Sequence, residues 1–233
     1  MRILKYIGLI IIFSLAACQT ALPTDATPLP GVNYKETHET LIPAGSFTMG
    51  SDMGFSDEQP VHEVSLSAFY IDTYEVTNYL YAQCVNDGKC SEPAGKDSVT
   101  RSNYYGNTEF NNYPVLAVNW NQASTYCAWR GARLPSETEW ERAARGTNPQ
   151  TFPWGETSDR TRANYNVFVG DTAAIGSYEA GKSPEGVYDL AGNVSEWVND
   201  WYQVYPGGDP AGGSYGEVYR VIRGGSWQDK ADS

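Results

Sequence analysis

The most informative segment of this sequence is residues 189–197, which read Asp189-Leu190-Ala191-Gly192-Asn193-Val194-Ser195-Glu196-Trp197. Its two carboxylates, Asp189 and Glu196, lie seven residues apart, with the unhindered Gly192 between them. Hard cations such as Ca²⁺ take about six to eight oxygen ligands from carboxylates, amides and backbone carbonyls, and a glycine lets the chain turn its carbonyls inward. The spacing therefore predicts a segment that can wrap one calcium ion. A solvated acidic turn before Trp197 is the alternative that these residues leave open.

Regular structure is expected mainly upstream of this segment. Helical periodicity stops at Gly146, so residues 147–233 are expected to form long loops held by something other than repetitive backbone hydrogen bonds. Alternating apolar and polar residues over 61–66 predict a half-buried strand, and residues 41–49 read as a short hairpin. Three helices are expected to begin at residues that cap helix N-termini: Thr77 or Asn78, Asn119, and Ser136.

Composition limits the functional classes. The chain has 233 residues, with 16 Lys and Arg against 28 Asp and Glu, so its formal net charge is 16 − 28 = −12. Electrostatic repulsion therefore argues against nucleic acid or anionic lipid headgroups as partners. Hydrophobic residues make up 41% of the chain, which also has 7 Trp and 17 Tyr. That is enough apolar surface to form one sizeable folded domain.

The N-terminus resembles a bacterial export signal. Two basic residues precede the apolar run Ile7 to Phe13, and Leu15-Ala16-Ala17-Cys18 follows. This last group resembles a lipobox, which implies a signal peptide over 1–17, cleavage before Cys18 and acylation of that cysteine. An ordinary signal peptide followed by a chance cysteine is the alternative. Residues 18–35 would then be the lipidated cysteine and a flexible tether, and the expected location is the cell envelope, lipid-anchored on the extracytoplasmic side of the membrane.

The other cysteines are interpreted in that oxidising context, where disulfides persist. Cys84 and Cys90 enclose an Asp87-Gly88 turn signal, so we expect a local disulfide between them. A reduced or metal-bound pair is the alternative. Cys127 lies on an expected helix beside aromatic residues, and there we expect a buried, free and inert thiol.

Six motifs follow one another in the order found in a known family. They read Ile42-Pro43-Ala44-Gly45-Ser46-Phe47-Thr48-Met49-Gly50, Tyr74-Glu75-Val76-Thr77-Asn78, Arg133-Leu134-Pro135-Ser136-Glu137-Thr138-Glu139-Trp140-Glu141, Phe152-Pro153-Trp154-Gly155, Gly192-Asn193-Val194-Ser195-Glu196-Trp197 and Arg223-Gly224-Gly225-Ser226-Trp227. In this order they resemble the formylglycine-generating enzyme, or sulfatase-modifying factor, family. The resemblance implies that residues 36–233 form one α+β domain, a loop-rich C-type lectin-like variant of the sulfatase-modifying factor fold. Such a domain has little regular secondary structure and is stabilised by calcium.

The resemblance also assigns calcium ligands. At the matching family positions, Asp189 and Glu196 donate side-chain oxygens, and Gly192 and Val194 donate backbone carbonyls. Calcium is therefore the expected cofactor. A second family calcium site is matched in this chain at Asn164, Tyr165 and Asp171.

The chemistry of the family uses two cysteines after the Gly-Gly-Ser motif. They bind copper(I) and activate oxygen to convert a sulfatase cysteine to formylglycine. Here Ser226 matches the motif, but Asp229 occupies the first cysteine position and the second falls beyond Ser233. Copper(I) prefers soft thiolates to a carboxylate, so a copper cofactor is not expected and no catalytic residue is assigned. The family normally continues past this point, so the resemblance leaves open a truncated C-terminus.

Other catalytic signatures are missing from the sequence. Its two histidines, His38 and His62, are 24 residues apart with no partner motif for zinc, and there is no glycine-rich phosphate loop. The leading hypothesis is an envelope-anchored, calcium-stabilised domain that is non-catalytic and binds a protein or glycan partner. The alternatives are a copper-dependent oxidase that converts a sulfatase cysteine to formylglycine, and a diverged maturation enzyme.

Overall fold

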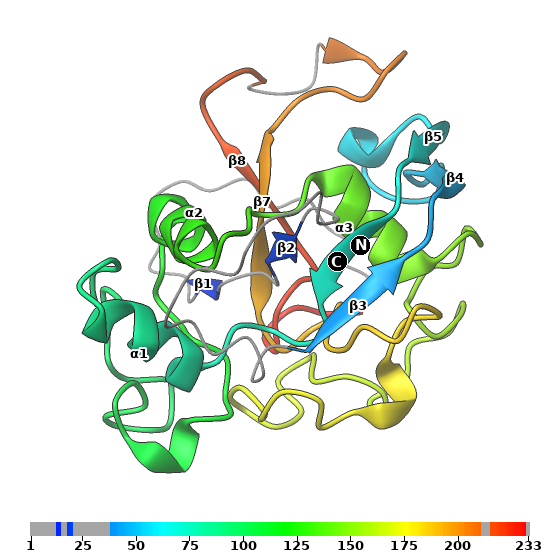
Figure 1. Cartoon of the computed structure of the whole chain (residues 1–233). Coiled ribbons are helices and arrows are strands. Elements are labelled where there is room, and N and C mark those ends of the chain that lie inside the picture. Colours follow the sequence, from blue (N-terminus) through cyan, green and yellow to red (C-terminus); the bar gives the residue numbers. More distant parts are fainter. Residues whose placement is uncertain (1–12, 15–17, 21–37, 211–214, 232–233) are drawn as a thin grey trace.

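The computed structural model describes residues 13–14, 18–20, 38–210 and 215–231 (Figure 1). Residues 147–194 contain only one short regular element, as the end of helical periodicity at Gly146 predicts. The expectation of loops as far as residue 233 is wrong at two strands, Ser195–Trp201 and Arg220–Arg223, which pair with each other. The described residues form a loop-rich α+β fold. Its elements are the helices α1 (Asn78–Asn86), α2 (Trp120–Trp129) and α3 (Glu137–Arg145), the 3-10 turns η2 (Ser56–Glu58), η3 (Thr108–Phe110) and η4 (Glu179–Gly181), and the strands β1 (Phe13–Ser14), β2 (Gln19–Thr20), β3 (Glu39–Ile42), β4 (Gly45–Met49), β5 (His62–Leu66), β6 (Phe69–Asp72), β7 (Ser195–Trp201) and β8 (Arg220–Arg223).

The three α-helices begin at residues whose side chains satisfy the first free backbone N–H groups. At α3, Ser136 Oγ accepts a hydrogen bond from Glu139 N at 3.2 Å, and the Glu139 carboxylate accepts one from Ser136 N at 2.7 Å. Asn119 and Gln122 form the same capping box at α2, and Thr77 caps α1. The predicted helix starts are therefore confirmed.

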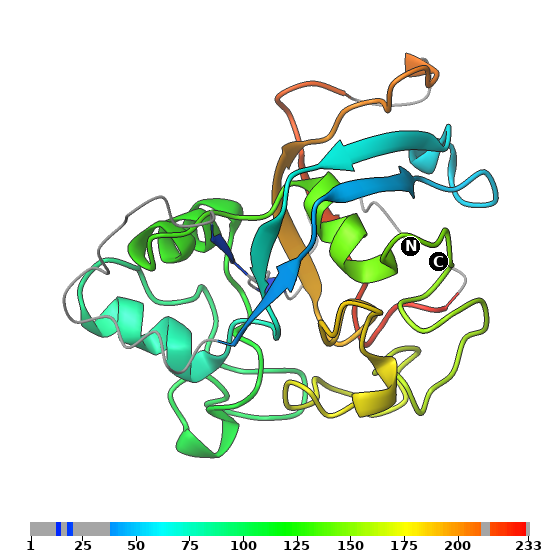
Figure 2. The ribbon, with the colours of Figure 1, turned by 45° about the vertical axis from the view of Figure 1, so that its right-hand side comes forward.

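The strands form three small sheets, with the orders β1-β7-β8, β2-β6-β3 and β4-β5. Figure 2 shows β3 and β4 running in succession past the partners β6 and β5. The strand predicted over 61–66 is confirmed as β5, but the hairpin predicted over 41–49 is wrong. β3 pairs with β6 and β4 pairs with β5, because the chain passes from one sheet to another at Pro43 and Ala44.

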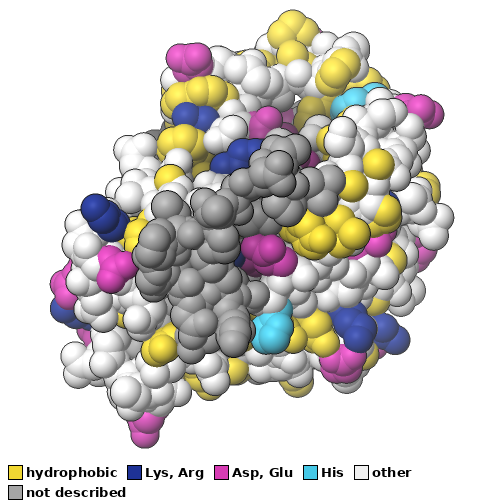
Figure 3. Space-filling view, viewed as in Figure 1, with side chains coloured by type: hydrophobic (Ala, Val, Ile, Leu, Met, Phe, Trp, Pro, Cys, Tyr) yellow, Lys and Arg dark blue, Asp and Glu magenta, His cyan; other side chains and the backbone are white. Residues whose placement is uncertain are grey.

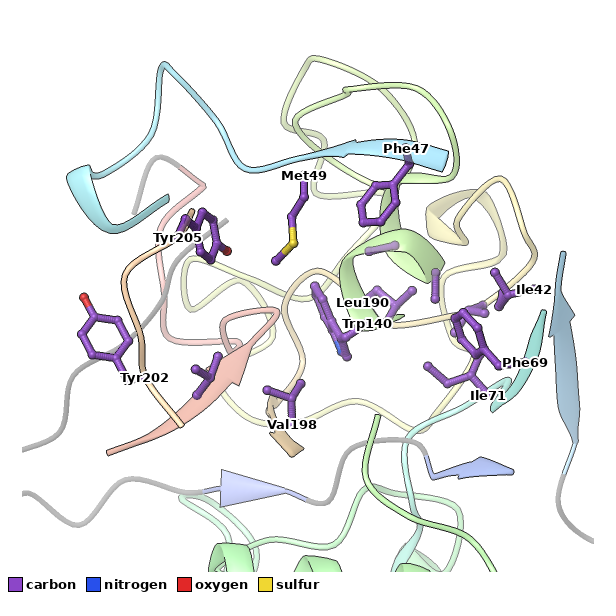
Figure 4. Packing of buried hydrophobic residues seen from close by; sticks show 14 residues of the cluster. Ile42, Phe47, Met49, Phe69, Ile71, Trp140, Leu190, Val198, Tyr202 and Tyr205 are labelled. Carbon is purple, nitrogen blue, oxygen red and sulfur yellow. The ribbon is translucent and has the colours of Figure 1, made fainter. Parts of the chain in front are cut away.

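The main core packs around Trp140 of α3, which is fully buried. Figure 4 shows Trp140 near the centre of this cluster, with Phe69 and Ile71 to one side and Tyr202 and Tyr205 to the other. A second core lies between α1 and α2 and contains all four cysteines. β7 follows directly on the 189–197 segment and places Val198 in the main core, so that segment is anchored by core packing.

All four cysteines are paired. The predicted Cys84–Cys90 disulfide is confirmed. The expectation of a free thiol at Cys127 is wrong, because Cys127 forms a disulfide with Cys18. Both sulfurs belong to fully buried residues, and Cys18 N donates a hydrogen bond to Asp72 Oδ2 at 2.9 Å. Backbone pairing of β2 with β6 brings Cys18 to this position, which sequence spacing did not indicate.

Residues 18–20 consequently belong to the fold and not to a tether. The Gln19 side chain donates a hydrogen bond to Glu139 Oε1 at 2.8 Å, and the Gln19 backbone exchanges hydrogen bonds with Arg133. A sulfur in a disulfide cannot also form a thioether to a lipid. The predicted lipidation of Cys18 is therefore incompatible with this disulfide.

The remaining predictions for the N-terminus concern segments of which the structure describes few residues. Phe13–Ser14, within the predicted signal peptide, pair in parallel with β7. Residues 1–12, 15–17 and 21–35 lie outside the described residues. In the part of the chain that the structure describes, no helix is both long enough and apolar enough to cross a membrane.

Candidate functional site

Two of the sequence motifs meet at one end of the β7–β8 ladder. The 189–197 segment leads into β7, and the Gly224-Gly225-Ser226 turn follows β8. Gly192 N donates to Gly224 O at 2.9 Å, and Trp227 N donates to Asn193 O at 3.0 Å. The loop with the predicted calcium ligands and the loop with the family's catalytic position are thus in direct contact.

Glycines at 192 and 224 permit this close approach. Both have positive φ, +88° at Gly192 and +87° at Gly224, a conformation in which other residues are strained. A Cβ on Gly192 would lie 2.3 Å from the backbone oxygen of Asn164, and one on Gly224 would lie 3.3 Å from the ring of Trp140. Space as well as backbone conformation therefore requires glycine at 192.

A small pocket of about 50 Å³ opens beside this contact. Ser226, Asp229 and Tyr165 line it. Phe152 and Trp154 form another part of its wall, and their rings stack with 5.3 Å between centroids. The structure thus brings Ser226 and Asp229 together with an aromatic motif more than seventy residues upstream.

The carboxylate of Asp229 is engaged within its own turn. Its Oδ2 accepts hydrogen bonds from Ser226 N and from Ser226 Oγ, both at 2.8 Å. No free thiol accompanies it, because all four cysteines of the chain are in disulfides. The described residues of the pocket therefore offer copper(I) no thiolate ligand.

The two acids of the 189–197 segment are buried, and neither forms an ion pair with a described basic residue. Asp189 Oδ2 accepts a hydrogen bond from Gly176 N, and Glu196 Oε2 accepts one from Trp140 Nε1, both at 2.7 Å. Burial raises the pKa of Asp189 to about 6. Burial, reinforced by the charge of Asp189, raises the pKa of Glu196 to about 8. Each carboxylate is thus poorly compensated by the protein itself.

A third buried acid, Glu75, interacts electrostatically with these two and was missed as a site residue. Its Oε2 accepts a hydrogen bond from Asn193 Nδ2 at 2.7 Å, across a sequence separation of 118. Burial raises the pKa of Glu75 well above its usual value, and the charges of Asp189 and Glu196 raise it further. The only signal in the sequence was the position of Glu75 in a family motif, because no spacing rule links residues so far apart.

The chemistry of this donor set fits a hard cation. The segment supplies two buried carboxylates and the backbone carbonyls of Gly192 and Val194. Asn164 Oδ1 and Glu75 Oε1 are also buried oxygens without a hydrogen-bond partner. Within the described ranges, no three His, Cys, Asp or Glu side chains are grouped to hold a metal ion. A calcium ion would therefore rely on two carboxylates plus carbonyl oxygens, as the family resemblance implies.

The second set of predicted ligands has a different arrangement. Asn164 Nδ2 donates to the backbone oxygen of Asp171 at 2.8 Å. The Asp171 carboxylate accepts hydrogen bonds from Ser98 Oγ and from Thr100 N and Oγ1, and it lies 3.3 Å from Arg101 Nη1. Burial acts to raise the pKa of Asp171, but the hydrogen bonds from Thr100 and Ser98 outweigh it and lower the pKa. This carboxylate ties the 98–101 loop to the 164–172 loop.

The two histidines occupy separate parts of the surface, visible as two cyan patches in Figure 3. The His62 ring bonds to Pro60 O through Nδ1 at 3.0 Å and contacts the ring of Tyr205. The His38 ring lies edge-on to Tyr74, with 6.0 Å between centroids. The fold does not bring the two imidazoles together.

The family model of the sulfatase-modifying factor enzyme 1-like domain matches residues 26–233. The chain is 33% identical over 258 residues to inactive C-alpha-formylglycine-generating enzyme 2 of Bos taurus, a match that covers 86% of this chain and 79% of that protein. It is 31% identical over 265 residues to formylglycine-generating enzyme of Streptomyces coelicolor, with coverage of 87% and 82%.

Another relative is much longer. The chain is 36% identical over 221 residues to serine/threonine-protein kinase pkn1 of Chlamydia caviae; the match covers 84% of this chain but 34% of that protein, so the chain spans about a third of its length. The solved structure of Treponema denticola variable protein 1 aligns with a TM-score of 0.65 and 28% identity, over 91% of this chain and 90% of that chain. Sequence and fold agree, and this chain belongs to the sulfatase-modifying factor family, which includes the formylglycine-generating enzymes.

Proposed function

We propose that this chain is a non-catalytic member of the family that acts outside the cytoplasm by binding a protein or glycan partner. One observation carries the proposal. The position of the first copper-binding cysteine is Asp229, whose carboxylate Oδ2 is held by Ser226 N and Oγ.

The cysteines of the chain do not replace the missing thiolate. Only the thiolate form of cysteine is a metal ligand, and each of the four cysteines is bonded to another. Cys127 and Cys18 are also fully buried. Copper(I) would have to bind through hard oxygen atoms, which are poor ligands for it.

Calcium is part of the proposal as a structural ion. Asp189 and Glu196 would hold it by their carboxylates, and Gly192 and Val194 by their backbone carbonyls. The ion would supply the positive charge that the two buried acids lack, and it would fix the loop that contacts the Gly224 turn. It has no part in a reaction.

The location outside the cytoplasm rests on the export-like N-terminus and on the two disulfides, which form and persist in oxidising compartments. Attachment to the envelope through a lipid on Cys18 would require the Cys18–Cys127 disulfide to be absent. The proposed location is therefore outside the cytoplasm and does not rely on that lipid.

Catalysis is the alternative function, either as a copper-dependent oxidase acting on a sulfatase cysteine or as a diverged maturation enzyme. The pocket lined by Ser226, Phe152 and Trp154 is the observation in its favour, because a substrate segment needs such a cleft. The pocket by itself does not distinguish catalysis from binding.

A direct assay separates the two functions. The purified protein is loaded with copper and incubated with a peptide that carries a Cys-x-Pro-x-Arg motif, and the aldehyde is sought by mass spectrometry. The Streptomyces coelicolor enzyme serves as positive control. We expect no aldehyde from this chain. Copper-dependent aldehyde would overturn the proposal, and its loss in Asp229→Ala would identify Asp229 as a replacement ligand.

A further inference from the structure

A second and larger cavity, of about 590 Å³, lies beside α1 and is separate from the pocket at Ser226. Its wall includes His38, Tyr74, Tyr79, Asn112 and Gly176. Small-molecule sites typically have volumes of about 300–1,000 Å³. The cavity therefore has the size of a ligand site, and neither the family's chemistry nor the predicted calcium ligands use it.

Several polar groups of the wall are free to bind a ligand. The side chains of His38, Tyr74, Tyr79 and Asn112 form no hydrogen bond with any other described residue. Tyr79 is 38% exposed. Two hydroxyls, an imidazole and an amide can both donate and accept hydrogen bonds, so this wall matches a ligand that also presents both kinds of group.

The aromatic part of the wall is held in place. The Tyr74 ring lies against Tyr188, with 4.8 Å between centroids, and His38 meets Tyr74 edge-on. Gly176 has φ +67°, and a Cβ there would lie 2.7 Å from Tyr74 Cε1. The absence of a side chain at Gly176 therefore makes room for the Tyr74 ring. A fixed ring is a suitable surface for stacking a flat apolar face of a ligand.

The two carboxylates of the cavity wall are almost wholly buried. Asp72 is 5% exposed, forms an ion pair with Arg130 and accepts from Cys18 N. Glu75 is 2% exposed; its Oε2 accepts from Asn193, and its Oε1 is buried without a hydrogen-bond partner. No Lys or Arg is among the described residues of the wall. An anionic ligand would find no Lys or Arg among these residues, and a cationic ligand would find no exposed carboxylate.

We infer that this cavity binds a neutral glycan, as the terminal mono- or disaccharide of a longer chain. Sugar hydroxyls both donate and accept hydrogen bonds, and the C–H face of a pyranose ring packs on an aromatic ring. Those properties match the free polar side chains and the fixed tyrosine. The inference rests on the proposed binding function and names its site and ligand class.

The test uses the full exported chain and an array of neutral and acidic glycans, and each hit is titrated by calorimetry. At least one neutral glycan should bind. Tyr79→Ala and Asn112→Ala should each weaken binding about tenfold, the size expected for loss of a stacking or hydrogen-bonding side chain. Neither side chain forms a hydrogen bond with another described residue, so both variants should melt like the parent. Phe168→Ala, at an aromatic side chain 58% exposed outside the cavity wall, is the control and should bind within about twofold of the parent.

Two results would overturn the inference. One is the absence of neutral-glycan binding when the folded chain is tested at millimolar sugar. The other is binding that Tyr79→Ala and Asn112→Ala leave intact while Phe152→Ala, in the pocket at Ser226, abolishes it. The proposed function fails only if the copper assay yields an aldehyde. The two results above come from glycan binding and leave that assay unchanged, so the two failures are distinguishable.

Discussion

Trp140 Nε1 donates a hydrogen bond to Glu196 Oε2 at 2.7 Å, between two residues that are both buried. The indole ring is at the same time the centre of the main core and lies against Gly224. One side chain thus links core packing, the 189–197 segment and the turn before Ser226. A substitution at Trp140 should therefore also perturb the 189–197 segment and the Gly224 turn of the candidate site.

Trp140→Phe should destabilise the fold strongly. It shortens a core side chain and removes the donor to a buried acid, and together these effects should lower the free energy of unfolding by about 2–4 kcal/mol. Urea unfolding followed by circular dichroism measures the loss. Trp129→Phe is the matched control, because the Trp129 indole donates to the exposed Asp87 at 3.1 Å. An equal decrease in the free energy of unfolding in both variants would show that the hydrogen bond to Glu196 adds no stability beyond that of an exposed one.

Calcium removal should lower the melting temperature. An ion at a concentration about a hundredfold above its Kd stabilises the folded state by about 2.7 kcal/mol, which is about 5–10 °C in a domain of this size. The chelator-induced shift should disappear in Glu196→Gln and persist in Glu63→Gln, an exposed acid on β5. Asp189→Asn provides a second test if Glu196→Gln does not fold. An unchanged melting curve in chelator, with no calcium in dialysed protein, would contradict the assignment.

Glu141 should make stability depend on acid pH. Its Oε1 accepts from Gly50 N and Arg145 Nη1, and its Oε2 accepts from Arg223 Nη2. Burial acts to raise the pKa of Glu141, but the charges of Arg223 and Arg145 outweigh it and lower the pKa. A lowered pKa in the folded state stabilises the fold above the unfolded value near about 4.3, and this contribution is lost as the pH falls further.

The measurement for Glu141 is urea unfolding between pH 3 and pH 7. Glu141→Gln should cost about 3–5 kcal/mol at neutral pH, because it breaks a buried ion-pair network from one side. The difference in the free energy of unfolding between parent and Glu141→Gln should narrow below about pH 4, because protonation of Glu141 then removes the carboxylate charge from the parent as well. Glu63→Gln should stay within about 0.5 kcal/mol of the parent at every pH. A gap that does not change with pH would refute the charge-based explanation.

Local patterns predicted the parts of the fold that local interactions build. The capping box of Ser136 with Glu139 and the Cys84–Cys90 disulfide each join residues close in sequence. Spacing alone is informative there because the partners are neighbours before the chain folds. The contact between Asp229 and Ser226 is of the same local kind, because both residues lie in one turn.

Pairings between residues far apart in the sequence could not be predicted from local spacing. The predicted 41–49 hairpin joined adjacent apolar runs, but each run found a better partner further along the chain, β6 for β3 and β5 for β4. Glu75 joined the buried acids through Asn193. Tertiary packing chooses among such partners, and an alternating pattern does not say which strand lies next to it.

Cys18 provides the sharpest test of the N-terminus, because its sulfur can carry a lipid or a disulfide but not both. The structure joins it to Cys127 across 109 residues, whereas the Leu15-Ala16-Ala17-Cys18 pattern favours acylation. Non-reducing peptide mapping of exported protein should recover the Cys18 and Cys127 peptides joined. Cys127→Ser should lower stability, by up to about 4–5 kcal/mol for so long a loop, whereas Cys90→Ser should cost about 2 kcal/mol. A diacylglyceryl group on Cys18, together with a free and unreactive Cys127, would instead show that residues 18–20 leave β2 in the mature protein. In that case Cys127→Ser would have little effect on stability.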